Sequence, residues 1–209
     1  MDGDKKISMA VIQRLPRYYR YLGDLMDKGV LRISSKEFSE HMGITASQMR
    51  QDINNFGSFG QQGYGYNVEL LHREIKRILG LEQKYSLILI GAGNLGQALV
   101  NYTNFVEWGF NFTAIFDNDS QIIGRHVNGI EILDVAGLEE YLKNNHVDAA
   151  ALALPETAAE EVAQTLAASG VKGIWNFSGS DLQVPEDVVV ENVRLTDSLM
   201  TLIYKVLTR

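Results

Sequence analysis

A glycine-rich hexapeptide follows the expected strand 85–90. It reads Gly91-Ala92-Gly93-Asn94-Leu95-Gly96, which is the pattern G-x-G-x-x-G, and it opens a stretch of helical composition. Between a strand and a helix, the first glycine makes a tight turn, the second lets the backbone approach a pyrophosphate, and the third lets the helix pack closely on the strand. The amino end of the helix then faces the phosphates. The segment therefore predicts a dinucleotide-binding loop.

An acidic residue stands at the distance that such a loop requires. Asp117 comes 21 residues after Gly96, directly after the apolar run 112–116. A carboxylate at this place accepts hydrogen bonds from the ribose hydroxyls of the adenosine and repels a 2′-phosphate, so it favours NAD(H) over NADP(H). Two alternatives stay open: a glycine turn kept for packing alone, and a site for coenzyme A or another adenylate.

A second group of polar residues lies on a short helix expected from Ala46 to about Asn55. Thr45 caps this helix, and a preceding helix is expected from the capping segment 34–37 to Gly43, so the two form a helix-turn-helix. Arginine, glutamine and asparagine side chains read base edges in DNA. The candidate DNA-reading residues of the second helix are Ser47, Gln48, Arg50, Gln51, Asn54 and Asn55. The alternative is an ordinary solvated helix surface.

A glycine- and aromatic-rich segment, 59–66, follows the helix-turn-helix and predicts a β-hairpin. A helix-turn-helix with such a hairpin is a winged helix, and a wing contacts the minor groove or the phosphates. The candidate DNA contacts of the wing are Phe59, Gln62 and Tyr64. Arg14 and Arg17, on the first helix, are further candidates for phosphate contacts, with pairing to Asp24 or to a partner subunit as the alternative.

The second part of the chain alternates between expected strands and expected helices. The strands are 85–90, 112–116, 147–154, 171–177 and 188–190, and the helices between them are 94–108, 135–144 and 156–169. This alternation predicts an α/β domain with a Rossmann-type doubly wound parallel sheet. The chain then closes with an amphipathic helix whose apolar face includes Leu195, Leu199 and Leu202.

The composition separates the two parts of the chain. The formal net charge is −7, but residues 1–80 carry +3 and residues 81–209 carry −10. We therefore expect a DNA-binding domain at 1–80 and a nucleotide-binding domain at 81–192. The chain has no cysteine, which excludes disulfides and thiol-based redox switching. No histidine or acidic cluster predicts a metal site or a catalytic base, and no segment predicts a membrane span, so we expect a cytoplasmic protein that is not an enzyme.

The motifs together resemble those of Rex, a family of bacterial transcriptional repressors that respond to the NADH/NAD+ ratio. The resemblance covers about 11–207 and rests on the segments 14–20, 46–52, 56–60, 63–66, 91–96, 173–177 and 199–202, with Asn101-Tyr102 and Phe116-Asp117. Several positions differ from commoner members of the family. Gln51, Gln61 and Gln62 replace basic residues, Arg194 replaces an aspartate, and Ser178-Gly179 replaces Ala-Pro.

The resemblance implies a homodimer whose C-terminal helix, 193–209, is swapped between subunits. It also implies that Arg50 lies on the recognition helix, that Asp117 holds the adenosine ribose, and that Tyr102 and Phe177 lie near the nicotinamide or the subunit interface. The function implied is repression from a palindromic operator, with release when NADH binds and with NAD+ as a competitor. The alternatives are an NAD-dependent oxidoreductase with an accessory helix-turn-helix, and a DNA-binding sensor of coenzyme A or another adenylate.

Overall fold

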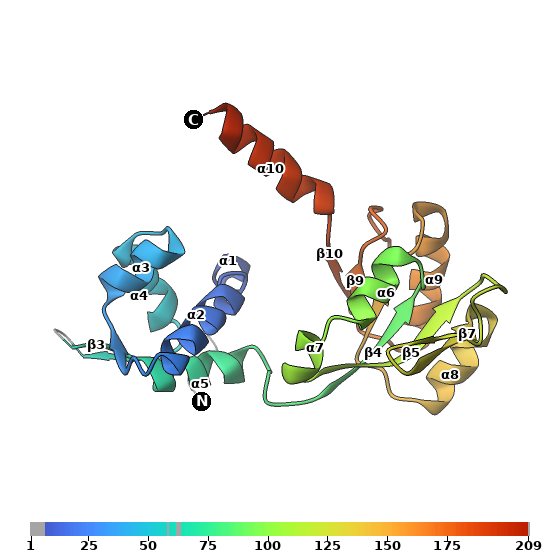
Figure 1. Cartoon of the computed structure of the whole chain (residues 1–209), viewed down its shortest axis with the longest axis horizontal. Helices are drawn as coiled ribbons and strands as arrows, with labels where there is room; N and C mark the ends of the chain where they lie inside the picture. The colour runs from blue at the N-terminus through green and yellow to red at the C-terminus, as the bar shows by residue number, and fades with distance from the viewer. Residues whose placement is uncertain (1–6, 58, 62–63, 209) are drawn as a thin grey trace. The chain divides into compact units, whose positions relative to one another are not determined.

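The computed structural model describes residues 7–57, 59–61 and 64–208, and it divides the chain into two compact units. Unit 1 is 1–83 and unit 2 is 84–209. The division falls three residues after the boundary expected from the charge and the pattern of apolar residues. Each unit has a hydrophobic core of its own. Figure 1 labels the helices and strands of both units.

Helices form most of unit 1. Their bounds are α1 Met9–Ile12, α2 Leu15–Asp27, α3 Ser35–Met42, α4 Ala46–Asn54 and α5 Val68–Ile78. Pro16 lies in the first turn of α2 and therefore begins the helix, where its missing N–H costs no hydrogen bond. Ser34 and Glu37 form the predicted capping box of α3, and Gly43 ends α3 in the left-handed conformation. The turn between α3 and α4 therefore follows the helix-turn-helix prediction.

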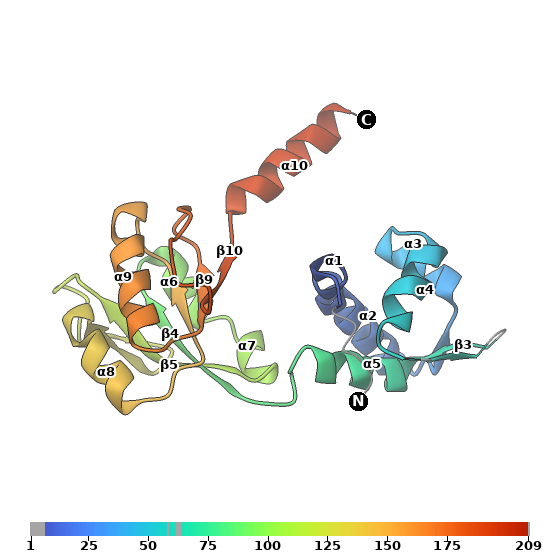
Figure 2. The ribbon, with the colours of Figure 1, turned by 180° about the vertical axis from the view of Figure 1, so that it is seen from behind.

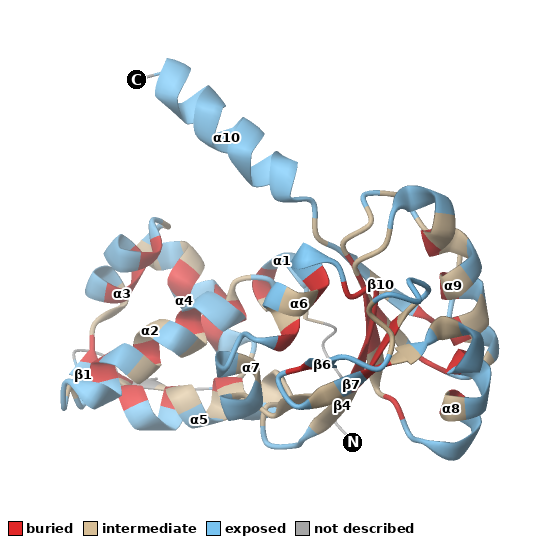
Figure 3. Cartoon of the chain, turned by 45° about the vertical axis from the view of Figure 1, so that its right-hand side comes forward, coloured by how far each residue is buried: buried red, intermediate tan, exposed pale blue. Residues whose placement is uncertain are grey.

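The core of unit 1 forms where the apolar faces of these helices meet. The largest fully buried side chains include Leu15, Tyr18 and Leu22 of α2, together with Phe38 of α3. Met49 and Ile53 fix α4 to the same core, since neither side chain is exposed. Figure 3 shows these buried stripes in red on one side of each helix. One face of α4 is consequently held inside, and the opposite face is left for other contacts.

A three-stranded antiparallel sheet completes unit 1. The strands lie in the order β1 Arg32–Ile33, β3 Gly65–Asn67 and β2 Gly60–Gln61, so the predicted hairpin is present and β1 is an addition to it. Gly65 has a φ of +72°, and a Cβ at this position would lie 2.5 Å from the carbonyl oxygen of Ile33. Only glycine fits there, because both the backbone conformation and the neighbouring strand exclude a side chain.

Unit 2 is built on a seven-stranded sheet. Its strand order is β10-β9-β8-β4-β5-β7-β6, and every neighbouring pair is parallel except β6 with β7. The bounds are β4 Tyr85–Ile90, β5 Phe110–Asp117, β6 His126–Val127, β7 Ile130–Asp134, β8 Ala149–Leu152, β9 Gly173–Asn176 and β10 Val189–Asn192. The order is that of a doubly wound Rossmann sheet with an antiparallel edge strand.

Alternate side chains of the strands fill two separate cores on the two faces of this sheet. Ile88 and Ile90 of β4 pack with α8 Leu138–Asn144 and α9 Glu156–Ala168. Leu89 points to the opposite face and packs near Val100, which belongs to α6 Asn94–Val100. Figure 2 shows α8 and α9 beside the sheet. The continuous apolar run 87–90 is explained by this two-sided burial.

Several elements of unit 2 differ from the sequence-based prediction. The expected helix 94–108 is two helices, α6 and the short α7 Asn104–Glu107, and the expected helix 135–144 begins with a 3-10 turn, Val135–Gly137. The strands β6 and β7 were not predicted. β6 contains two residues, and β7 has one buried residue in five, so both lack the apolar run that marked the central strands.

The terminal helix α10, Leu195–Leu207, contains no buried residue. It is amphipathic, yet its large apolar side chains are exposed, as its pale blue colour in Figure 3 shows. Among the described residues, no helix combines the length and apolar character that a membrane span requires.

Candidate functional site

The glycine loop lies where β4 ends and α6 begins. Gly91 donates its N–H to the carbonyl oxygen of Phe116 at 2.8 Å, which continues the pairing of β4 with β5. Its φ is +97°, and a Cβ there would lie 2.5 Å from the carbonyl oxygen of Ala153. The chain can turn sharply at this point only because residue 91 is glycine.

The other two glycines of the loop stand in opposite surroundings. A Cβ on Gly93 would meet no atom within 4 Å, whereas a Cβ on Gly96 would lie 2.0 Å from the carbonyl oxygen of Gly91. Gly96 is therefore required for the protein's own packing. Gly93 faces open space, which is where a pyrophosphate approaches the backbone in a dinucleotide-binding loop. Asn94 and Leu95 are exposed at the start of α6 beside this space.

Two side chains hold the loop at Ala92. The N–H of Ala92 donates to the Asp117 carboxylate at 2.6 Å, and the Gln97 amide donates to the Ala92 carbonyl oxygen at 2.7 Å. The second Asp117 oxygen accepts the N–H of Asp119 at 2.9 Å. A carboxylate accepts about four hydrogen bonds, so Asp117 still has capacity for ribose hydroxyls. Gln97 was not predicted, because its role depends on the turn rather than on a motif.

The two candidate nicotinamide residues, Tyr102 and Phe177, lie at the ends of one series of aromatic contacts. Tyr102 packs on Phe105 at 4.8 Å between ring centroids, Phe105 on Trp175 at 5.7 Å, and Trp175 on Phe177 at 4.5 Å. The tertiary structure thus connects two residues that are 75 positions apart in the chain. Phe105 and Trp175 join them. Trp175 lies in the segment 173–177 that carries the family resemblance, whereas Phe105 was not predicted to belong to the site.

The recognition-helix candidates lie on α4, or directly after it in the case of Asn55, away from its buried face. Ser47, Arg50, Gln51, Asn54 and Asn55 are exposed, and Gln48 is half-buried. The Asn55 amide is engaged with the helix itself, since it donates to the carbonyl oxygens of Gln51 and Asp52. Arg50 makes a long contact of 3.4 Å with the hydroxyl of Ser35, at the start of α3.

Arg14 has a structural partner that the sequence analysis did not identify. Its guanidinium donates two hydrogen bonds to Asp52 of α4, at 2.7 and 2.8 Å, in place of the pairing to Asp24 considered above. The Tyr18 hydroxyl donates to the same carboxylate at 2.6 Å. Burial and the bond to Asp52 raise the pKa of Tyr18, so the hydroxyl keeps its proton and remains a donor. Asp52 is 3% exposed and therefore anchors α4 to α2 from inside unit 1.

Arg17 also bonds within unit 1. It donates to the carbonyl oxygens of Met42, at 2.9 Å, and His41, at 3.1 Å, where α3 ends. A cation at the carboxyl end of a helix is favourable because the last carbonyl groups lack helical partners. Both predicted phosphate-binding arginines thus stabilise the helix-turn-helix in this structure.

The wing presents one exposed aromatic side chain. Tyr64 is 70% exposed, and the Arg32 guanidinium of β1 lies 5.9 Å from its ring centroid. Phe59 instead packs against the core of unit 1. Gln62 lies outside the described residues. The contact of Arg32 with Tyr64 was not predicted because β1 itself was not expected. Only the pairing of β1 with β3 brings Arg32 beside Tyr64.

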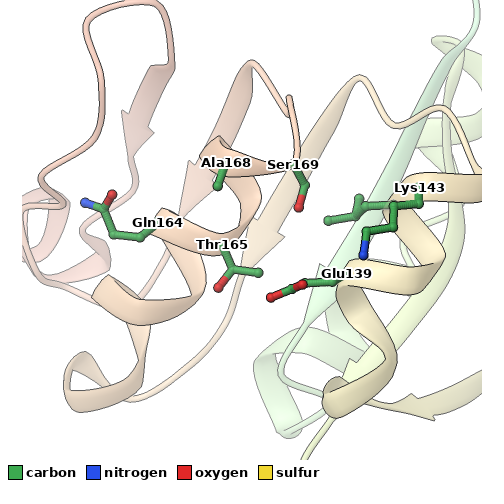
Figure 4. Close-up of a pocket in the computed structure, with 7 residues that line it drawn as sticks. Glu139, Lys143, Gln164, Thr165, Ala168 and Ser169 are labelled. Carbon is green, nitrogen blue, oxygen red and sulfur yellow. The ribbon is translucent and has the colours of Figure 1, made fainter.

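Two hollows in unit 2 lie away from the glycine loop. One, of about 600 Å³, lies between α8 and α9 and has polar side chains including Glu139, Lys143 and Gln164 (Figure 4). The other, of about 560 Å³, is apolar and includes Phe105, Trp108 and Trp175. Among the residues that the structure describes, no group of histidine and acidic side chains could hold a metal ion.

The fold and the two sites define a class: a winged-helix protein with a Rossmann domain for a nucleotide. Comparison with known families agrees with this class. Residues 6–54 match a family described as "Putative DNA-binding protein N-terminus", and residues 82–179 match one described as "CoA binding domain".

A "Redox-sensing transcriptional repressor Rex" from Clostridioides difficile (strain 630) is 56% identical over 98% of this chain and 97% of its own length. The same-named protein of Clostridium botulinum (strain Hall / ATCC 3502 / NCTC 13319 / Type A) is 57% identical over 97% of this chain and 96% of its own.

Solved structures show the same relationship. The structure titled "RSP in complex with beta-NAD+ and operator DNA" has a TM-score of 0.91 and 52% identity, and it covers 96% of this chain and 92% of its own. A complex of RSP with beta-NADH has a TM-score of 0.90 and 49% identity over 97% of this chain and 95% of its own. The chain belongs to the Rex family of redox-sensing transcriptional repressors.

The contrast between Gly93 and Gly96 gives a direct prediction. Gly93→Ala leaves the fold intact, since its Cβ meets no atom, but weakens NADH binding at least about tenfold by filling the space beside the backbone. Gly96→Ala instead destabilises unit 2 by about 2 kcal/mol or more, since helix α6 must move off β4. Calorimetric titration and urea unfolding measure the two effects. Equal NADH affinity in Gly93→Ala and the unmodified chain would contradict the site.

The Asp52 anchor gives a second prediction. Asp52→Ala leaves Arg14 and Tyr18 without their partner and destabilises unit 1 by about 2–3 kcal/mol. Both tryptophans, Trp108 and Trp175, belong to unit 2, so their fluorescence serves as a reference while circular dichroism follows the loss of helix. The matched control is Asp24→Ala at an exposed position of α2, with an expected change below about 0.5 kcal/mol. Identical unfolding of the two variants would show that the anchor adds no stability.

Proposed function

We propose that this chain represses transcription by binding a palindromic operator with unit 1 and that NADH, bound in unit 2, releases it. NAD+ competes for the same site without causing release. The observation that carries the proposal is the coexistence in one chain of an open glycine loop, held by Asp117, and a recognition helix with an exposed polar face. Relatives solved with NAD+ and operator DNA, and with NADH, support this combination.

Asp117 favours NAD(H) among the nucleotides that the loop could hold. Its carboxylate is fixed at the end of β5 by the N–H groups of Ala92 and Asp119. There it receives the ribose hydroxyls of an adenosine whose pyrophosphate lies at Gly93, and its negative charge disfavours a 2′-phosphate. Coenzyme A is the competing ligand because the family description of residues 82–179 names it.

The redox state is distinguished by the charge of the nicotinamide ring. The oxidised ring is cationic and the reduced ring is neutral, and a cation is costly to place among apolar groups. The partly buried members of the aromatic series, Phe105, Trp175 and Phe177, supply such surroundings. NADH therefore stabilises one form of the protein more than NAD+ does, as any ligand that shifts a conformational equilibrium must.

A homodimer accounts for the exposed side chains of α10. Leu199, Leu202 and Ile203 are each more than half exposed, and they lie on one face of the helix. An apolar helix face of this kind is covered by a partner in a soluble protein. A second copy related by two-fold symmetry covers α10 and also places two recognition helices on the two halves of a palindrome.

The test of the function is a binding titration with labelled operator DNA. Fluorescence anisotropy measures operator affinity without nucleotide and then with NADH, NAD+ or coenzyme A. We expect NADH to weaken binding at least about tenfold and NAD+ to restore it by competition. Release by coenzyme A instead of NADH would identify an adenylate sensor. Operator binding that NADH leaves unchanged would contradict the proposal.

Arg50→Ala separates the two sites. Arg50 is exposed on α4 and is the residue of that helix best suited to a bidentate contact with guanine, so its loss weakens operator binding about tenfold or more. NADH affinity stays unchanged because Arg50 belongs to unit 1. Lys143→Ala, on α8 of unit 2, removes the same charge and serves as the control. Unchanged operator affinity in Arg50→Ala would exclude Arg50 from the DNA contact.

A further inference from the structure

Asn176 is a buried polar residue at the carboxyl end of β9. It is 1% exposed, and its side chain makes four hydrogen bonds, two through each end of the amide. A buried amide that is fully bonded holds its partners in one arrangement, because any displacement leaves a polar group unpaired away from water. Its partners therefore indicate which parts of unit 2 it keeps together.

The first set of partners belongs to the loop 177–181. Asn176 Oδ1 accepts hydrogen bonds from the N–H of Ser178, at 3.0 Å, and from the Ser178 hydroxyl, at 2.7 Å. Asn176 Nδ2 donates to the carbonyl oxygen of Ser180 at 2.8 Å. Gly179 allows this path, since its φ is +89°. The loop is thus wrapped around one side chain, and it begins with Phe177, an end of the aromatic series described above.

The second set of partners belongs to the segment that leads into α10. Asn176 Nδ2 also donates to Asn192 Oδ1 at 2.8 Å, and the N–H of Val193 donates to the Asn176 carbonyl oxygen at 2.8 Å. Arg194 forms an ion pair with Asp181 of the loop. The helix α10 begins at the next residue, Leu195. The loop and the base of α10 are therefore joined through Asn176 inside and through Arg194 outside.

We propose that Asn176, bonded at once to the loop 177–181 and to Asn192, is a positioning residue that transmits occupancy of the nucleotide site to α10. The inference rests on the function proposed above, in which Phe177 lies near the nicotinamide and α10 joins the two subunits. A ligand that shifts Phe177 displaces the loop. If the Asn176 amide moves with the loop, its hydrogen bond to Asn192 either displaces Asn192 or breaks. The base of α10 then moves with the loop.

The strength of this link sets the size of its effect. A neutral hydrogen bond contributes about a factor of five in an equilibrium constant. Removing the Asn192 acceptor leaves the loop bonded to Asn176 but frees the base of α10 from the side-chain link. The coupling between NADH and operator DNA, measured as the ratio of operator Kd with and without NADH, then falls about fivefold.

Three variants test the link, each in the full-length chain. Asn192→Ala removes the acceptor at an exposed position and opens no buried cavity, whereas Asn192→Asp keeps a carboxylate oxygen for Asn176 Nδ2. Asn144→Ala is the matched control, because it removes an exposed asparagine with one 2.9 Å hydrogen bond on α8. Anisotropy with operator DNA and titration with NADH give the affinities and the coupling ratio for each variant.

We expect Asn192→Ala to keep NADH affinity and nucleotide-free operator affinity within about twofold while its coupling ratio falls about fivefold. Asn192→Asp and Asn144→Ala keep the ratio of the unmodified chain. An unchanged ratio in Asn192→Ala, an equal fall in Asn192→Asp, or a loss of NADH affinity itself would overturn the link. A ratio of one in the unmodified chain would instead contradict the proposed function.

Discussion

The hydrogen bond from the Ala92 N–H to the Asp117 carboxylate is the interaction on which the nucleotide site depends. It joins the turn after β4 to the end of β5, the two places that bind the pyrophosphate and the adenosine ribose in the proposed site. Gly96 closes α6 onto the same turn, and Gln97 holds the Ala92 carbonyl oxygen from the helix side. The protein's own hydrogen bonds and packing therefore hold the loop in shape, and a preorganised loop lowers the entropy cost of binding.

Unit 1 uses a carboxylate in a comparable way. Asp52 points inward from α4 and binds Arg14, which precedes α2, and Tyr18 of α2, so α4 is fixed in rotation about its own axis. The exposed face of α4 has no such bonds to the core and stays available. Arg14 and Arg17, which were predicted to contact phosphates, also make hydrogen bonds inside unit 1 that hold α4 and the end of α3 in place.

The chain contains no cysteine, yet it belongs to a family of redox-sensing repressors. Redox sensing without thiols needs a ligand that carries the redox state, and the nicotinamide of NAD(H) does so as a change of one charge. A protein can detect that change only if the ring lies among groups that favour one state and if those groups are connected to a mobile element. The aromatic series and the Asn176 hydrogen bonds supply such a connection within unit 2.

Local patterns in the sequence were sufficient for the capping box at Ser34, the glycine loop and the apolar strands, because each depends on neighbours within a few residues. The parallel sheet follows from the alternation of strands and helices, since parallel strands need helical crossovers. The strands β1, β6 and β7 could not be predicted, because short half-exposed strands exist only through pairing with a partner. The same holds for Arg14 with Asp52, Arg32 with Tyr64, and Asn176 with Asn192: each pair is brought together by the packing of distant segments. The sequence by itself determined which chemistry the chain carries, and the tertiary structure decided which side chains hold it in place, because hydrogen-bond partners are selected by proximity in space and not by spacing along the chain.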